Sequence, residues 1–106
     1  GRLKEIGEKT DNINKISGQY MGLLKISPIG WENIKNILNE FAQEKIDTLD
    51  MTSLLGLLLD RDIVINVVPI DGKWCEVDSG EDLDRYKKRI AEVDSIGKCW
   101  PHDWRW

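Results

Sequence analysis

The residues best suited to chemistry are two carboxylates, Glu76 and Asp78, in the stretch Trp74-Cys75-Glu76-Val77-Asp78. Side chains alternate along a β-strand, so a strand here would place both carboxylates on one face. Proteins hold Mg²⁺ with one or two carboxylates, together with water and substrate phosphate. The spacing therefore predicts part of a magnesium site. The alternative is a solvated strand face on which Asp78 helps to cap the helix that follows.

A second cluster, Gly7-Glu8-Lys9-Thr10, follows a short alternating segment. A lysine in a glycine-containing turn can hold a phosphate, and Glu8 can accept hydrogen bonds from hydroxyl or amine donors. The alternative is a charged surface turn. Because the sequence contains no Gly-x-Gly-x-x-Gly, no Walker loop and no Ser/His/Asp set, these clusters do not make a complete active site.

Three helices are expected to position these clusters. Ser27, Asp50 and Ser79 are typical N-cap residues, so helices are predicted to begin at the residues that follow them. Asp82 lies three residues after Ser79, which resembles a capping box. Apolar residues then recur with helical spacing and predict a buried face for each helix. In the first helix these are Ile34, Ile37, Leu38 and Phe41. The broader apolar face of residues 51–59 predicts burial of the second helix on more than one side.

The remaining patterned segments are typical of β-strands. Strands are expected over residues 2–6 and 19–26, and a hairpin over residues 63–77 with its turn at Asp71-Gly72. The order of strands and helices predicts an α/β fold in which a mixed β-sheet is flanked by helices.

The composition excludes several classes of protein. The chain has 106 residues, 32% of them charged, and a formal net charge of −4, so a broad basic face for nucleic acid is not expected. No apolar run approaches the roughly 20 residues that a membrane span needs. The charged start of the sequence is unlike a signal peptide, so we expect a cytoplasmic protein.

The two cysteines, Cys75 and Cys99, are expected to be reduced thiols, because a zinc site with His102 would lack a fourth ligand. The tail, residues 93–106, contains three of the five tryptophans. We expect their rings to fold back onto an apolar surface. The alternative is a contact with a partner or a second copy, since tryptophan anchors interfaces well.

Several stretches together resemble the C-terminal half of the sugar-phosphate and choline-phosphate nucleotidyltransferases. They are Gly1-Arg2-Leu3-Lys4-Glu5-Ile6-Gly7-Glu8-Lys9, Ser17-Gly18-Gln19-Tyr20-Met21-Gly22-Leu23-Leu24-Lys25, Asp50-Met51-Thr52, Val67-Val68-Pro69-Ile70-Asp71-Gly72 and Trp74-Cys75-Glu76-Val77-Asp78-Ser79-Gly80-Glu81-Asp82. They cover about residues 1–92 in the family's order. The Gly-x-Trp-x-Glu-x-Asp stretch is the most specific of them.

The resemblance implies a partial, Rossmann-like nucleotidyltransferase domain. Such enzymes join a nucleoside triphosphate to a phosphorylated small molecule and release pyrophosphate, as in nucleotide-sugar biosynthesis or in cytidylyltransferases. Here the acceptor would be a sugar 1-phosphate or a phosphocholine-like molecule. The family's magnesium ligand corresponds to Asp78, and Glu76 would share the ion in the choline-phosphate branch.

The resemblance also implies acceptor-binding residues. The family's Glu-Lys pair, which contacts the acceptor and its phosphate, corresponds to Glu8 and Lys9. Gly18 lies where the family brings its backbone close to the acceptor, and Tyr20 would line that pocket. Many sugar enzymes continue with proline where this chain has Thr10, so the choice between a sugar and another acceptor stays open.

The family's N-terminal glycine-rich loop and its first metal-binding aspartate have no counterpart here. We therefore expect a truncated or cleaved part of such an enzyme, over residues 1–92, that is inactive alone. Strand edges and helix faces left uncovered predict self-association or docking with the missing half. The alternative is a non-catalytic binding or oligomerisation module on the same scaffold, supported by the tryptophan-rich tail and the broad leucine face of residues 51–59.

Overall fold

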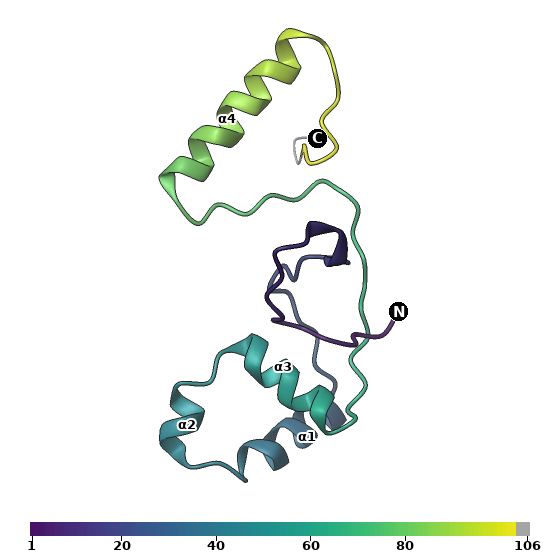
Figure 1. Cartoon of the computed structure of the whole chain (residues 1–106), viewed down its shortest axis with the longest axis vertical. Helices are drawn as coiled ribbons and strands as arrows, with labels where there is room; N and C mark the ends of the chain where they lie inside the picture. The colour runs from purple at the N-terminus through teal and green to yellow at the C-terminus, as the bar shows by residue number, and fades with distance from the viewer. Residues whose placement is uncertain (104–106) are drawn as a thin grey trace. The chain divides into compact units, whose positions relative to one another are not determined.

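The computed structural model describes residues 1–103, and their regular structure is helical (Figure 1). The elements are η1 (Ile13–Lys15), α1 (Pro28–Leu38), α2 (Gln43–Asp47), α3 (Met51–Asp60) and α4 (Gly80–Ser95). The chain divides into two compact units, Gly1–Val68 and Pro69–Trp106, which are called unit 1 and unit 2 below. The division predicted from the sequence, residues 1–92 followed by a tail, stays a prediction.

The three predicted helix starts are confirmed. A side-chain oxygen of Ser27, Asp50 and Ser79 accepts a hydrogen bond from the backbone N–H three residues later, at 3.0, 2.7 and 3.1 Å respectively. These bonds satisfy N–H groups that have no partner inside the helix, which is why such residues favour helix starts. Helix α2 was not predicted, and its N-cap, Ala42, makes no side-chain hydrogen bond.

The core of unit 1 lies between α1 and α3. Its buried residues are Ile34 and Ile37 from α1 and Leu55 and Leu58 from α3. Leu38 and Phe41 pack against them, so the apolar stripe predicted for the first helix is confirmed.

Two features fix the end of α3. The N–H groups of Asp62 and Ile63 bond back to the carbonyls of Leu59 and Leu58, each at 3.0 Å, which is a Schellman arrangement with Asp62 in the left-handed region (φ 57°). Arg61 also forms a bidentate ion pair with Glu40, at 2.8 and 2.6 Å. This exposed ion pair connects the residues that follow α1 with the end of α3.

The predicted mixed β-sheet is wrong. Among residues 1–103 the strand-like pairing is one isolated antiparallel bridge, between Arg2 and Asn66. The segments predicted as strands over residues 2–6, 19–26 and 63–77 are extended or irregular chain, and the predicted hairpin has no ladder. Sheets of fewer than three strands are rarely stable without further support. Within residues 1–103, the backbone of residues 65–67 pairs with the N-terminal segment and with no second strand. An α/β fold is therefore not supported.

Unit 2 consists of α4 and the segments on either side of it. The Lys73 N–H donates to the Pro101 carbonyl at 2.8 Å, and Gly72 (φ 70°) lies so close to that carbonyl that a Cβ would overlap it. The Trp100 ring lies against Tyr86 of α4, with centroids 5.9 Å apart. The expectation that the tail folds back is thus met at Trp100, whereas Trp104 and Trp106 lie outside the described residues. No helix among residues 1–103 is both long and apolar enough to cross a membrane.

Candidate functional site

A shallow hollow of about 250 Å³ lies in unit 1 between the N-terminal segment and α3. The residues that line it are Lys4, Glu5, Ile6, Glu8, Gly56, Leu59 and Asp60. The predicted acceptor-binding residue Glu8 is among them. The hollow is therefore the candidate site for a small ligand in unit 1.

Backbone pairing holds the N-terminal wall of the hollow in place. The Leu3 N–H donates to the Ile65 carbonyl, and the Val67 N–H donates to the Gly1 carbonyl, both at 2.9 Å. Ile6 packs against the core of unit 1, so the segment is fixed at both ends. Polar residues that follow Ile6 are thereby kept beside α3.

Two glycines shape the hollow. Gly7 has a φ of 82°, and a Cβ built there would lie 2.8 Å from the Cγ2 atom of Thr52, so the segment passes close to the first turn of α3. Gly56 lies in the middle of α3, and a Cβ built there would meet nothing within 4 Å. The absence of a side chain at Gly56 leaves open space on the helix side of the hollow.

The charges around the hollow are unequal. Three carboxylates, Glu5, Glu8 and Asp60, and one ammonium group, Lys4, belong to its lining. The formal charge of these four side chains, three acidic and one basic, is −2. An anion alone would be repelled by this lining, whereas a ligand with a cationic nitrogen would find carboxylate partners. The lining thus combines charges of both signs, with the negative charges in excess.

The other predicted acceptor-binding residues do not line the hollow. Lys9, Gly18 and Tyr20 belong to the same unit, and all three are exposed. Their roles in binding stay predictions. Glu8 is the residue of this set that the fold places beside α3.

The predicted metal ligands belong to unit 2. Glu76 and Asp78 are exposed and lie in the irregular segment before α4, so the strand alternation that placed them on one face does not apply. Within residues 1–103 no group of three His, Cys, Asp or Glu side chains is arranged to hold a metal ion. The carboxylates of Glu76 and Asp78 could still supply part of the ligands of Mg²⁺, because the ion needs only one or two protein carboxylates when substrate phosphates complete its coordination shell.

At the start of α4, the side chain that supports the N-cap Ser79 is Asp82 rather than Asp78. The Asp82 carboxylate accepts hydrogen bonds from the Ser79 hydroxyl at 3.0 Å and from the Asp78 N–H at 3.3 Å. The bond from Ser79 is the main reason that the pKa of Asp82 is lowered. The cap itself is the bond from the Asp82 N–H to the Ser79 hydroxyl oxygen, so it does not involve the Asp78 side chain.

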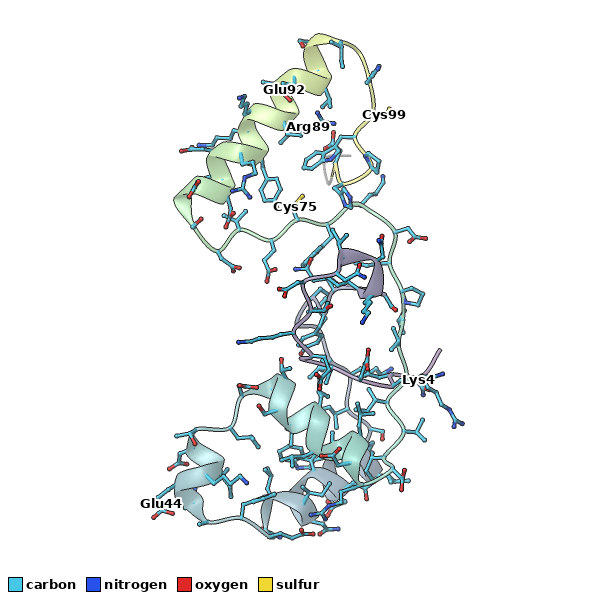
Figure 2. The ribbon with its side chains drawn as sticks, in the orientation of Figure 1. Lys4, Glu44, Cys75, Arg89, Glu92 and Cys99 are labelled. Atoms are coloured by element: carbon cyan, nitrogen blue, oxygen red, sulfur yellow. The ribbon has the colours of Figure 1, made fainter. Side chains whose placement is uncertain are left out.

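Both cysteines are free thiols. Cys75 is half-buried in unit 2 (Figure 2), and its Sγ lies 3.7 Å from the His102 carbonyl. Burial, and to a smaller degree the charge of Asp103, raises the pKa of Cys75. A raised pKa lowers the fraction of thiolate at a given pH, which makes the thiol a weaker nucleophile.

Of the seven residues that line the hollow, sequence reasoning proposed only Glu8 as a site residue; the polar and glycine residues that it missed are Lys4, Glu5, Gly56 and Asp60. A signal for two of them was present. Gly56 interrupts a leucine-rich helix, and Asp60 lies four residues later on the same helical face.

The comparisons with known proteins give one similarity. The chain is 30% identical over 92 residues to a CTP:phosphoglutamine cytidylyltransferase of Campylobacter jejuni. The match covers 79% of this chain and 36% of the relative, so the chain spans about a third of that protein's length. No protein-family model matches the sequence, and no solved structure matches it. The similarity supports a relation to nucleotidyltransferases, as the sequence motifs predicted.

Proposed function

We propose that this chain is the acceptor- and metal-binding part of a magnesium-dependent nucleotidyltransferase, and that it is inactive alone. The observation that carries the proposal is the similarity over 92 residues to a protein named as a cytidylyltransferase. The hollow in unit 1, which contains Glu8, supports an acceptor site there. CTP would be the nucleotide, by analogy with the relative's name.

The charge of the hollow narrows the choice of acceptor. A sugar 1-phosphate without an amino group carries no cationic nitrogen, so the excess of carboxylates around the hollow would oppose its binding. Phosphocholine and an amino-acid phosphate such as phosphoglutamine carry both a cationic nitrogen and a phosphate. We therefore favour an acceptor of this second class, with the nitrogen near Glu8 and the phosphate near Lys4.

Transfer would proceed by in-line attack of an acceptor phosphate oxygen on the α-phosphorus of the nucleotide, with pyrophosphate as the leaving group. Such a reaction depends on positioning and on neutralising the charge of the phosphates. Bound Mg²⁺ would supply part of that neutralisation. Asp78 and Glu76 are the residues of this chain that would hold the ion, and Glu8 and Lys4 would orient the acceptor.

Acceptor binding is tested by NMR titration of the chain with phosphocholine and, separately, with a sugar 1-phosphate. Phosphocholine is expected to shift the amide signals of Glu8 and Gly56 more strongly than the sugar phosphate does. Glu8→Gln should weaken this response. The matched control is Glu44→Gln, which changes an exposed carboxylate on α2 outside the hollow (Figure 2). This variant should respond to phosphocholine like the wild type. Equal responses in the wild type and Glu8→Gln would contradict the site.

Metal binding is tested with Mn²⁺ as a paramagnetic substitute for Mg²⁺. Broadening is expected first at the signals of Glu76 and Asp78, and Asp78→Asn should reduce it. Asp84→Asn removes an exposed carboxylate of the same unit and should leave the broadening unchanged. Broadening that is indifferent to Asp78→Asn would contradict the assignment.

Inactivity is tested by incubating the chain with CTP, dTTP or UTP and each acceptor. Turnover by the 106-residue chain would show that it needs no further part. The alternative function, a non-catalytic binding or oligomerisation module, gains support if acceptor binding fails while the chain associates with itself.

A further inference from the structure

The two predicted metal ligands, Glu76 and Asp78, lie in a segment without regular structure. Residues 73–78, here called the carboxylate segment, form neither a helix nor a strand. The end of the segment is held by α4, because the Asp78 N–H donates to the Asp82 carboxylate at 3.3 Å. The start of the segment belongs to no element, so its position is set by contacts with other parts of unit 2.

The residues after α4 supply such contacts. Residues 100–103, here called the closing segment, form a tight turn in which the Asp103 N–H donates to the Trp100 carbonyl at 3.0 Å. Proline is favoured at the second position of a turn, which is the position of Pro101. The carbonyls of Pro101 and His102, in the middle of the turn, are the groups that meet the carboxylate segment.

The two segments touch at three points. The Lys73 N–H donates to the Pro101 carbonyl at 2.8 Å, and the Cys75 Sγ lies 3.7 Å from the His102 carbonyl. Gly72, just before the carboxylate segment, lies so close to Pro101 that any side chain there would collide with it. The closing segment therefore fixes the part of the carboxylate segment that α4 does not hold.

The closing segment is in turn anchored on α4. The Trp100 ring lies against the Tyr86 ring, with centroids 5.9 Å apart, and both side chains are half-buried. Aromatic pairs at this distance attract each other beyond the apolar area that they bury. The carboxylate segment is thus connected to α4 at both ends, directly at Asp78 and through the closing segment at Lys73.

We propose that the closing segment positions the metal ligands Glu76 and Asp78, with Trp100 and Pro101 as its positioning residues. The inference rests on the proposed function, which assigns the two carboxylates to Mg²⁺. A segment that is already ordered loses less conformational entropy when it binds an ion, so its affinity is higher. The closing segment acts through the backbone of the carboxylate segment and touches no ligand of the ion itself.

Two variants release the closing segment by different routes, and each has a matched control. Gly72→Ala places a Cβ against Pro101, whereas Gly97→Ala also puts an L-residue at a positive φ in unit 2 but meets nothing within 4 Å. Trp100→Ala removes the ring from Tyr86, whereas Trp100→Phe keeps an aromatic ring there. Because the two routes share only the closing segment, a common effect identifies it as the cause.

The first readout is the Mn²⁺ concentration that half-broadens the amide signal of Asp78. It is expected to rise by about fivefold or more in Gly72→Ala and Trp100→Ala, which is the lower end of typical coupling between two sites. Gly97→Ala and Trp100→Phe should keep the wild-type value. Broadening at Asp78 that is equal in the wild type, Gly72→Ala and Trp100→Ala overturns the positioning and leaves the metal site intact. A wild type without broadening at Asp78 contradicts the metal site, and the positioning role falls with it.

The second readout needs no variant. Coupling between two sites is reciprocal, so an ion that binds the ordered segment must also stabilise the closure. Saturating Mg²⁺ should therefore slow hydrogen exchange of the Lys73 amide, whose N–H bonds to Pro101, by the same factor that Gly72→Ala loses in Mn²⁺ affinity. The Asp62 amide, which bonds to the Leu59 carbonyl in unit 1, is the control and should keep its exchange rate. An unchanged Lys73 rate with the ion bound at Asp78 overturns the proposal, because a purely structural closure does not respond to the ion.

Discussion

Replacing Gly7 by alanine tests whether the N-terminal segment packs on α3 as described. Gly7 has a φ of 82°, where an L-residue costs about 1–2 kcal/mol. The added Cβ would also lie 2.8 Å from the Thr52 Cγ2 atom, and relieving such crowding typically costs about 1–3 kcal/mol. Gly7→Ala is therefore expected to lower the free energy of unfolding of unit 1 by about 2–5 kcal/mol.

Gly22 provides a matched control for the cost of placing an L-residue at a positive φ. Its φ is 83°, but a Cβ there meets nothing within 4 Å, so Gly22→Ala should cost only the conformational part, about 1–2 kcal/mol. Thr52→Ala removes the crowding atom and should recover at least about 1 kcal/mol in a double-mutant cycle with Gly7→Ala.

Urea denaturation followed by the methyl NMR signals of Leu55 and Leu58 measures these free energies, because both residues lie in the core of unit 1. If Gly7→Ala and Gly22→Ala lower the free energy of unfolding equally, and Gly7→Ala shows no coupling to Thr52→Ala, the N-terminal segment does not pack on α3 as described. The hollow would then have to be abandoned as well, because the same segment forms one of its walls.

The other predictions concern α3 and α4. Gly56→Ala is expected to raise the stability of unit 1 by about 0.5–1 kcal/mol in the same urea assay, because alanine favours a helix interior and the space beside Gly56 is open; a loss of stability would show that the space is filled. Ser79→Ala should cost about 1 kcal/mol of helix stability, seen as faster hydrogen exchange in the first turn of α4. The Ser79 hydroxyl also holds the pKa of Asp82 below its ordinary value of 3.8. A lowered folded-state pKa stabilises α4 above about pH 4, and this contribution is lost as the pH falls through that pKa. A carboxyl NMR titration should therefore show the pKa of Asp82 rising in Ser79→Ala, and an unchanged value would contradict the hydrogen bond.

The helices were predictable because their signals are local. Ser27, Asp50 and Ser79 each bond to an N–H three residues away, so the residues that decide the helix start are neighbours in the sequence. Helix α2 was not predicted because it spans five residues and has no side-chain cap. Short helices of this kind depend on their surroundings rather than on their own sequence.

The strands were wrongly predicted because a strand depends on a partner that local pattern does not reveal. Residues 63–68 have the β-branched composition of a buried strand, yet the described chain offers them pairing along one edge only. The same limit applies to the site. Glu8 was identified from its position after an alternating segment. Gly56 and Asp60 line the hollow only because α3 packs beside that segment, which a local pattern does not reveal.

The hydrogen bond from Lys73 to Pro101 closes a loop that contains the whole of α4. Cys75 lies just inside this closure, with its thiol against the His102 carbonyl. The rate at which a thiol reagent labels Cys75 should consequently follow the opening of the loop, since a covered and protonated thiol reacts slowly. The labelling rate of Cys75 therefore reports whether Pro101 and His102 stay in contact with the segment before α4.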